Sequence, residues 1–498
     1  MSFFYTSVDR LGNKICFRGY KDGKRVERRV EFTPTLFLPS KEPTEYKTLN
    51  GKFVSPINPG SMGECYQFIK QYEDVDGFEI YGNQNYVHQF ISDIFQESCN
   101  WDINLINIVS LDIEVMSDRG FPHADQALFP ITAITLTSSL DKKYYVWGLG
   151  DWSKEQSINQ DLDVVYVKCA DEKELLLRFL AHWIRIKPDI ITGWNVRLFD
   201  LVYIINRLKF LLGDDEAKKI SPWNYIRSGS IVIKGRENQV YEIAGIQQLD
   251  YLDLFKKFTY GTEYFTPENH RLDTIANMVL GLKKLDYSEY ASLNELYKQN
   301  HQKFIDYNIR DTHLISLLDD KMGLIELCLT IAYKGLVNYA EAFGPVNLWD
   351  AFIYNELKKN NIVIPPRKFQ SKDRQIAGGH VKEPKPGMYN WVVSFDLNSL
   401  YPHIIMQYNL SPETILNQVI PGVFIDDLLQ KVDFNIPKNS TMTALGQLFS
   451  TVDKGFFPKL VEGLYKDRSI IKDQMLEKKQ ELAKIKEEMK RRGINTPE

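Results

Sequence analysis

The chain has 498 residues, of which 44% are hydrophobic and 25% charged, as in folded globular proteins long enough for several domains. Its net charge of −4 excludes a uniformly basic nucleic-acid coat protein, so any nucleic-acid site has to be a local patch. The five cysteines show no zinc-ligand spacing, and no apolar run reaches membrane-spanning length. We therefore expect a soluble intracellular protein with reduced thiols.

The pattern of strands and helices along the chain predicts an α/β multidomain protein. Residues 1–101 consist of short strand-like runs separated by turns, and strands then alternate with helices over residues 102–324. That alternation predicts an α/β domain with a mixed sheet. A helical region over about 321–360 ends near Pro365, and one long polar helix is expected from about residue 457.

Two acids lie in a strand-like stretch, NIVSLDIEV (107–115). Asp112 and Glu114 alternate there with large apolar residues, so a strand would present both acids on one face. Taken alone, such a pair is more often a solvated strand edge than a metal site.

Three further candidates lie on predicted helices. Asp200 precedes an apolar pattern of helical spacing, which places it at a helix start, where it would pass as an ordinary cap. Tyr307 and Asp311, in FIDYNIRDTHL, are one helical turn apart on one face, where they could form an ordinary surface pair.

In this order and spacing, the five residues resemble the DEDDy signature of 3′–5′ exonucleases. The resemblance implies an RNase H-like domain in which the four acids bind two Mg²⁺ or Mn²⁺ ions, because carboxylate oxygens favour these metals over zinc. Two such ions neutralise a phosphodiester and stabilise both its attacking and its leaving oxygen. Tyr307 would orient or help to deprotonate the attacking water.

A second motif, VSFDLNSLYPHII (393–405), predicts a buried strand that ends on Asp396. It resembles motif A of family B DNA polymerases, and the surrounding sequence resembles the replicative polymerases of T-even-type bacteriophages. The resemblance implies a discontinuous mixed α+β N-terminal domain, the exonuclease domain, a partial palm and the first fingers helix. These domains would cover, in that order, residues 1–101 with 325–365, 102–324, 366–456 and 457–498.

The resemblance to family B also implies roles for the residues around Asp396. Asp396 would bind the catalytic metals of the polymerase site, and Tyr401 would lie under the sugar of the incoming nucleotide. The backbone between these two residues and two cations one turn apart on the last helix would bind the triphosphate; these residues are Leu397, Asn398, Ser399, Leu400, Arg468 and Lys472. Without the resemblance, the two cations would be read as a solvated helix face.

Other positions match the family less completely. Phe121 and Asn195 would contact single-stranded DNA near the exonuclease site. Gly378 and Gly379 match an element that contacts the template backbone, although Ile376 stands where the family has tyrosine. Residues 230–243 predict a hairpin with its turn at residues 235–238, which in the family helps to separate primer from template.

The second polymerase acid has no counterpart in this sequence. A family B polymerase also needs an aspartate from a YGDTDS-type hairpin and a lysine from a KxxxNSxYG helix, and neither string occurs here. Apolar residues recur about every 3.5 positions from Leu464 to Met489, which predicts an antiparallel partner helix, and Gly493 then suits a C′ position. We expect a separate C-terminal polymerase half as partner; the alternative is a truncated piece of a longer polymerase.

Three functions compete at this point. The first is the proofreading part of a DNA-directed DNA polymerase in an infected bacterial cytoplasm, with primer–template DNA, single-stranded DNA and dNTPs as ligands. Its assembled form would meet a sliding clamp and a single-stranded DNA-binding protein. The second is a stand-alone 3′–5′ exonuclease, which would not need Asp396 or Tyr401. The third is a non-catalytic translational repressor, which would not need the five exonuclease residues.

Overall fold

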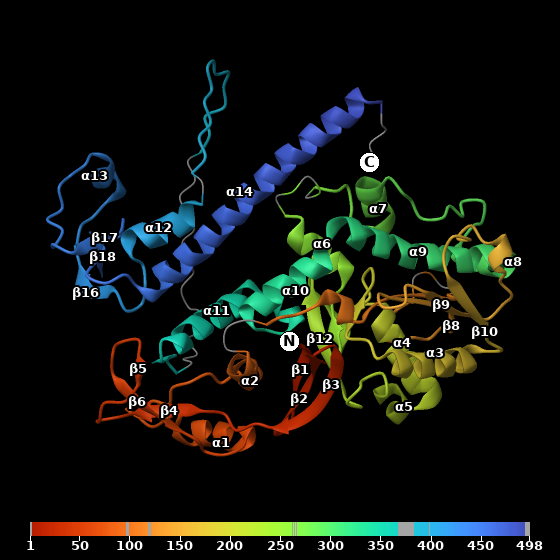
Figure 1. The fold of residues 1–498 in the computed structure, drawn as a ribbon, viewed down its shortest axis with the longest axis horizontal. Coiled ribbons are helices and arrows are strands. Elements are labelled where there is room, and N and C mark those ends of the chain that lie inside the picture. Colours follow the sequence, from red (N-terminus) through yellow and green to blue (C-terminus); the bar gives the residue numbers. More distant parts are fainter. Residues whose placement is uncertain are drawn as a thin grey trace. The chain divides into compact units, whose positions relative to one another are not determined.

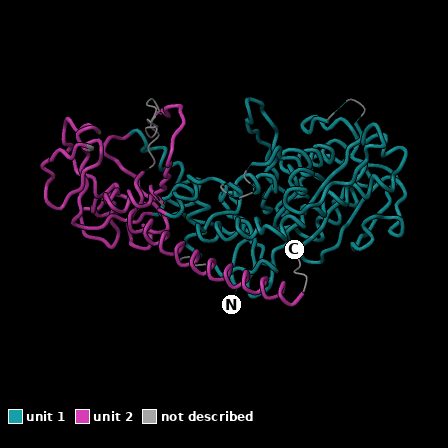
Figure 2. Tube along the Cα trace, turned by 90° about the horizontal axis from the view of Figure 1, so that it is seen from above, with its two compact units in different colours: residues 1–34, 58–74, 83–352 teal, residues 35–57, 75–82, 353–498 magenta. Residues whose placement is uncertain are grey.

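The computed structural model describes most of the chain (Figure 1), namely residues 2–95, 99–117, 120, 122–260, 262, 264, 266–366, 383–397 and 399–493. The chain forms two compact units (Figure 2): a first unit of residues 1–34, 58–74 and 83–352, and a second unit of residues 35–57, 75–82 and 353–498. No helix within the described ranges is long and apolar enough to cross a membrane.

The first unit begins with a three-stranded antiparallel sheet, β1 (Phe3–Leu11), β2 (Lys14–Lys21) and β3 (Lys24–Glu31). Asp22 and Gly23 join β2 to β3 with φ values of 51° and 75°, which is the two-residue turn that an Asp-Gly pair favours. The helices α1 (Met62–Tyr72) and α2 (Tyr86–Ile94) follow. The predicted pattern of short strands and turns is confirmed for this part of the chain.

A mixed six-stranded sheet forms the centre of the first unit and confirms the predicted α/β character. Its strand order is β10-β9-β8-β7-β11-β14, with β7 antiparallel to β8 and parallel to β11. The strands are β7 (Ile108–Val115), β8 (Ile131–Ser138), β9 (Tyr144–Gly148), β10 (Val164–Lys168), β11 (Ile190–Thr192) and β14 (Gln247–Gln248).

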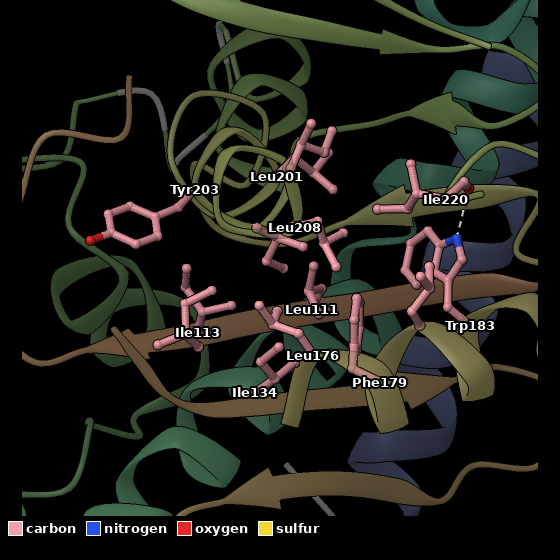
Figure 3. Packing of buried hydrophobic residues seen from close by; sticks show 14 of the residues in the cluster. Leu111, Ile113, Ile134, Leu176, Phe179, Trp183, Leu201, Tyr203, Leu208 and Ile220 are labelled. Atoms are coloured by element: carbon pink, nitrogen blue, oxygen red, sulfur yellow. Dashed lines mark hydrogen bonds between the residues drawn. The ribbon is translucent and has the colours of Figure 1, made fainter. Parts of the chain in front are cut away.

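Helices cover both faces of this sheet. On one face, Leu111 and Ile113 of β7 pack against α3 (Glu172–Ile186) and α4 (Asp200–Leu212), as Figure 3 shows. On the other face, β8 and β9 pack against α9 (His301–Met322). Because side chains alternate along a strand, the acids of β7 point to the α9 face while its large apolar residues point to α3 and α4.

The remaining elements of the first unit connect these layers. They are η1 (Ile103–Leu105), η2 (Lys154–Gln156), α5 (Asp214–Lys218), α6 (Tyr251–Phe258), α7 (Leu272–Leu280), α8 (Leu293–Gln299), α10 (Leu324–Gly335) and η3 (Tyr339–Phe343). The helix α11 (Pro345–Lys359) then continues the chain into residues of the second unit.

The predicted hairpin exists, but its turn lies elsewhere. The strands β12 (Ile226–Ile233) and β13 (Arg236–Ile243) pair along their whole length, and Lys234 and Gly235 form the turn with φ values of 50° and 77°. The predicted turn at residues 235–238 is therefore wrong, since Asn238 pairs with Ile231 inside the ladder. A two-residue turn with both φ angles positive fits the twist of the flanking strands better than a longer one.

A buried ionic network ties the N-terminal sheet to the central sheet within the first unit. The carboxylate of Asp189, just before β11, accepts hydrogen bonds from Thr6 and Tyr20 at 3.0 Å and from Arg25 Nη2 at 2.8 Å. Arg18 donates to the carbonyl of Pro188 at 2.8 Å. Both Arg18 and Asp189 have 0% exposure, so their charges depend on each other and on these partners.

The described residues of the second unit form two small sheets, the end of α11 and three further helices. One sheet has the order β15-β5-β6-β4 and the other β16-β18-β17. The elements are β4 (Leu36–Pro39), β5 (Tyr46–Thr48), β6 (Phe53–Ile57), β15 (Ile362–Val363), α12 (Leu400–Tyr408), β16 (Ile415–Val419), α13 (Ile425–Leu429), β17 (Ser440–Met442), β18 (Gln447–Ser450) and α14 (Phe456–Arg491). The long helix predicted from about residue 457 is confirmed, and Gly493 has the positive φ of a C′ residue.

The strand predicted to end on Asp396 is wrong. Residues 392–397 have no regular secondary structure, and among the described residues they pair with no strand. Their apolar side chains are exposed, with Phe395 at 90% and the preceding Trp391 at 98%. An apolar run becomes a buried strand only where a neighbouring strand and a covering layer exist, and the described part of this unit provides neither.

Candidate active site

Three carboxylates from two elements meet on the α9 face of the central sheet. One oxygen from each of Asp112 and Glu114 on β7 and Asp311 on α9 lies within 4.8 Å of the other two. The strand contributes two acids because alternate residues share a face, and the helix contributes the third from above that face. Three hard oxygen donors at this spacing suit a divalent cation such as Mg²⁺ or Mn²⁺.

One carboxylate oxygen of Asp311, Oδ1, is available as a metal ligand. Its Oδ1 is buried and makes no hydrogen bond within the described residues. A buried carboxylate oxygen without a partner is costly, because it has lost its hydration and gained nothing in return. A cation bound there would supply the missing interaction, so the residues present fit a metal ion.

Asp200 is the first residue of α4 and is buried beside the three acids. Its Oδ1 accepts a hydrogen bond from the backbone N–H of Ile113 at 3.0 Å, which links the helix start to β7. Phe199, not Asp200, is the N-cap residue of α4. The three-carboxylate group itself does not include Asp200, whose carboxylate lies near enough to raise the pKa of Asp112.

Burial governs the protonation of these acids. Burial, followed by the repulsion of Asp311, raises the pKa of Glu114 to about 8, and burial raises the pKa of Asp200 to about 7. Burial and the neighbouring carboxylates also raise the pKa of Asp112 well above its usual range. Without a cation, the cluster therefore holds protons near neutral pH, and a bound cation would displace them.

Tyr307 lies one helical turn before Asp311 on α9, at the edge of the cluster. Its hydroxyl accepts a hydrogen bond from Lys284 Nζ at 3.2 Å, and its ring meets Tyr287 edge-on with centroids 5.4 Å apart. Burial, followed by the charge of Asp311, raises the pKa of Tyr307 above its usual range. The hydroxyl therefore keeps its proton and can donate it in a hydrogen bond.

Lys284, which follows α7, is a site residue that sequence reasoning missed. Its ammonium group contacts the carboxylate of Asp311 as well as Tyr307, and its backbone N–H donates to Asp273 at 2.8 Å. Burial opposes the charge, but Asp311, Tyr307 and Asp112 together outweigh that effect and raise the pKa of Lys284. A lone lysine in a loop carries no sequence signal, because its role depends on the fold bringing it to the acids.

Asn308 is a second residue that sequence reasoning missed. It follows Tyr307 on α9 and has 0% exposure. Its Nδ2 donates to Asp112 Oδ2 at 2.6 Å, while its Oδ1 accepts from the hydroxyl of Thr135 at 2.5 Å. The two hydrogen bonds connect β8, α9 and β7 at the centre of the site.

Asn195 lies in a loop that Asp250 holds in place. The carboxylate of Asp250 accepts from the backbone N–H groups of Asn195 and Arg197 at 3.0 Å each. Asn195 has a φ of 67°, and Gly193 lies so close to the carbonyl of Leu111 that a side chain there would clash. The loop is thus fixed against β7, with the side chain of Asn195 half-buried.

Four other predicted positions lie outside the described residues: Phe121, Gly378, Gly379 and Asn398. Ile376, named with the two glycines, also lies outside them.

The predicted polymerase residues lie in the second unit and are more exposed. Asp396 and Leu397 belong to the exposed segment, Ser399 has a φ of 54°, and Leu400 and Tyr401 form the first turn of α12. The side chain of Tyr401 is 79% exposed. The only potential metal-binding group of acids, histidines or cysteines found within the described ranges is the one on β7 and α9, so Asp396 belongs to none.

Arg468 and Lys472 lie one turn apart on α14, and both are exposed. The helices α12 and α14 pack together, with the rings of His403 and Tyr465 edge-on at 4.9 Å. The two cations therefore share a helix with a residue that contacts α12, which begins directly after Ser399.

Comparison with known proteins gives two matching families. Residues 83–275 match the exonuclease domain of DNA polymerase family B, and residues 349–491 match DNA polymerase family B. Tyr307, Asp311 and Lys284 lie outside both matched ranges.

Among curated relatives, the DNA-directed DNA polymerase of Escherichia phage RB69 is 36% identical over 83% of this chain and 48% of its own length. That of Enterobacteria phage T4 is 31% identical over 98% of this chain and 55% of its own length. The DNA polymerase delta catalytic subunit of Candida albicans is 26% identical over 72% of this chain and 34% of its own length. The chain thus spans about half the length of the phage relatives that it matches.

Proposed function

The chain belongs to the family B DNA polymerases, and we propose that it carries their 3′–5′ proofreading exonuclease together with the first part of the polymerase catalytic domain. The observation that carries this proposal is the convergence of Asp112, Glu114 and Asp311 within 4.8 Å. Asp200 and Tyr307 adjoin the same cluster. Hydrolysis of a phosphodiester bond by such a site would remove a mismatched nucleotide from a primer end.

Asp112, Glu114, Asp200 and Asp311 would hold two Mg²⁺ or Mn²⁺ ions. When bound, these ions would neutralise the phosphate and lower the pKa of the attacking water. The carboxylates would have to be ionised to hold them, so cation binding and proton release are coupled. Lys284 would balance part of the negative charge of the cluster.

The contact with Lys284 determines the direction in which the hydroxyl of Tyr307 donates its hydrogen bond. Its hydroxyl oxygen accepts from Lys284 Nζ, so the O–H donates away from the lysine, where the carboxylate of Asp311 is one acceptor. A protonated hydroxyl in this place would orient the attacking water by a hydrogen bond rather than act as the base. The raised pKa of Tyr307 supports this role.

DNA synthesis would require a separate C-terminal portion. Asp396 would bind the polymerase metals, the backbone of residues 397–400 with Arg468 and Lys472 would bind the triphosphate, and Tyr401 would contact the sugar. The exposure of Asp396 and its neighbours supports the need for a further polypeptide segment that brings the second acid and a covering strand. The assembled enzyme would act on primer–template DNA and dNTPs in the bacterial host, with a sliding clamp and a single-stranded DNA-binding protein.

A labelled primer–template with a mismatched 3′ end tests the proposal. In Mg²⁺ and all four dNTPs, the chain should shorten the primer without extending it. The double substitution D112A/E114A should lower the rate of shortening about a thousandfold, since metal ligands supply several kcal/mol of transition-state stabilisation. D396A, which removes a single carboxylate from the second unit, should leave shortening unchanged.

Undiminished degradation by D112A/E114A would disprove the site. Extension by this chain alone would disprove the need for a second portion.

A further inference from the structure

We propose that Thr135 and Asn308 are positioning residues of the exonuclease: they fix the carboxylate of Asp112 so that the amide holds one oxygen and the other faces the cation site. This inference rests on the proposed function. It names two residues that would act through Asp112 without touching substrate or cation.

The three residues form one directed chain of hydrogen bonds. Thr135 lies directly opposite Asp112 in the antiparallel β7–β8 pair. Thr135 Oγ1 donates to Asn308 Oδ1 at 2.5 Å, and Asn308 Nδ2 donates to Asp112 Oδ2 at 2.6 Å. The amide thus reaches down from α9 and joins two neighbouring strands.

The direction of this chain follows from what each group can donate. A carboxylate that binds a cation only accepts hydrogen bonds, so Asn308 has to present its NH₂ group to Asp112. A carboxamide has one donor end and one acceptor end of nearly the same shape, so packing alone would not choose between them. The acceptor-only carboxylate of Asp112 therefore selects the NH₂ end, and the hydroxyl of Thr135, by donating to the carbonyl end, satisfies the amide in that orientation and holds it there.

Burial makes the wrong orientation costly. Thr135 and Asn308 both have 0% exposure, so water cannot replace a missing partner. A flipped amide would place its carbonyl oxygen against the carboxylate oxygen of Asp112, and the two acceptors would repel each other. The carboxylate would then rotate away or hold a proton, and either change would weaken cation binding.

A purely structural role is the competing explanation. Buried amides also serve as satisfied polar groups that hold a helix on a sheet. The two explanations differ in what they predict for cation affinity, because a structural pair would affect stability and leave the oxygen that faces the cation unchanged.

Mn²⁺ binding to the DNA-free chain distinguishes the two explanations. Free Mn²⁺ has an electron paramagnetic resonance signal that disappears on binding, so the dissociation constant is measured without any turnover. Thr135→Val removes the hydroxyl at constant shape and should weaken Mn²⁺ binding about tenfold, the lower end of the effect typical of groups that orient metal ligands. Thr135→Ser keeps the hydroxyl and should bind Mn²⁺ like the parent chain.

A double-mutant cycle tests whether the two residues act in series. Asn308→Ala should weaken Mn²⁺ binding at least as much as Thr135→Val, and the combined variant should be no worse than Asn308→Ala alone. Thr135→Ala is measured in parallel, since it removes the same hydroxyl and relieves any crowding that valine introduces. Primer shortening by each variant should follow the order of Mn²⁺ affinity.

Every other outcome would overturn either the positioning role of the two residues or the proposed function. Equal affinity of Thr135→Val and the parent chain, equal loss in Thr135→Val and Thr135→Ser, or additive losses in the cycle would overturn the positioning role and leave the proposed function intact. No Mn²⁺ binding by the parent chain would overturn the proposed function and this inference with it.

Discussion

Each of the two units carries an acidic sequence motif, but the acids of the first unit are packed between a strand and a helix, whereas the acid of the second unit is exposed. In the first unit, Asp112 and Glu114 lie in a paired strand beneath a helix that adds Asp311, and Asn308 and Lys284 contact Asp112 and Asp311. In the second unit, Asp396 lies in an exposed segment with no strand beside it among the residues that the structure describes. The difference shows that a site is defined by its tertiary neighbours, because the residues that compensate buried acids come from distant parts of the chain.

The largest expected effect on stability comes from the ionic network of the first unit. Asp189→Ala removes a fully buried carboxylate from Arg18 and Arg25 and leaves Arg18 with Glu27 as its carboxylate partner; breaking a buried ion pair costs about 3–5 kcal/mol of unfolding free energy. Denaturant unfolding followed by tryptophan fluorescence measures this loss. Trp391→Ser, in the exposed segment of the second unit, should leave the transition midpoint unchanged; an equal shift in both variants would contradict the contrast.

The next largest expected effect distinguishes Tyr307, in the motif of the first unit, from Tyr401, in the motif of the second unit. Tyr307→Phe removes the hydroxyl beside the acid cluster and should slow primer shortening about a hundredfold, the loss expected when a reacting group is misplaced by about 1 Å. Tyr401→Phe should leave the rate of shortening unchanged, because its ring lies in the other unit. Single-turnover assays on single-stranded DNA give both rates, and a comparable loss in Tyr401→Phe would show that the assignment to one site is incorrect.

A smaller effect concerns pH and cations. The pKa values of Glu114, about 8, and Asp200, about 7, lie above those of an unfolded chain, so in EDTA the folded state binds more protons than the unfolded state between about pH 4 and pH 8. The unfolding free energy should therefore fall as pH rises through this window, and Mg²⁺ should offset the loss. Thermal unfolding at pH 5 and pH 8, with EDTA or Mg²⁺, measures both changes.

The matched control for this pH effect is D112A/E114A, which should show a weaker pH dependence in EDTA and little response to Mg²⁺. A parent chain that becomes more stable as pH rises in EDTA would show that the acids are not protonated as their burial indicates.

The sequence predicted the elements that hold the acids of the candidate site, because each has a local pattern. Alternation placed Asp112 and Glu114 on one face of β7, and helical spacing placed Tyr307 and Asp311 on one face of α9. Lys284, Asn308 and Thr135 could not be found in this way, since each becomes part of the site only through tertiary contact.

Two other predictions failed for physical reasons of a different kind. The turn of the β12–β13 hairpin was placed too late, because the Lys234-Gly235 turn is a weaker sequence signal than Asn-Gly or Asp-Gly. The strand at Asp396 has the right composition, but a strand also needs an adjacent strand, and composition does not report whether one is there.

The contact between Asp112 and Asn308 has a consequence for how the protein is made. It joins residues 196 positions apart, so β7 leaves the ribosome well before α9 does. At roughly 5–20 residues per second, the interval is on the order of 10–40 s. A nascent chain during that time has two acids but neither the third carboxylate nor the amide that orients the first. Under the proposed function, the newborn polypeptide would therefore pass through a long stage without a complete cation site, and the site would form only when α9 packs on the sheet.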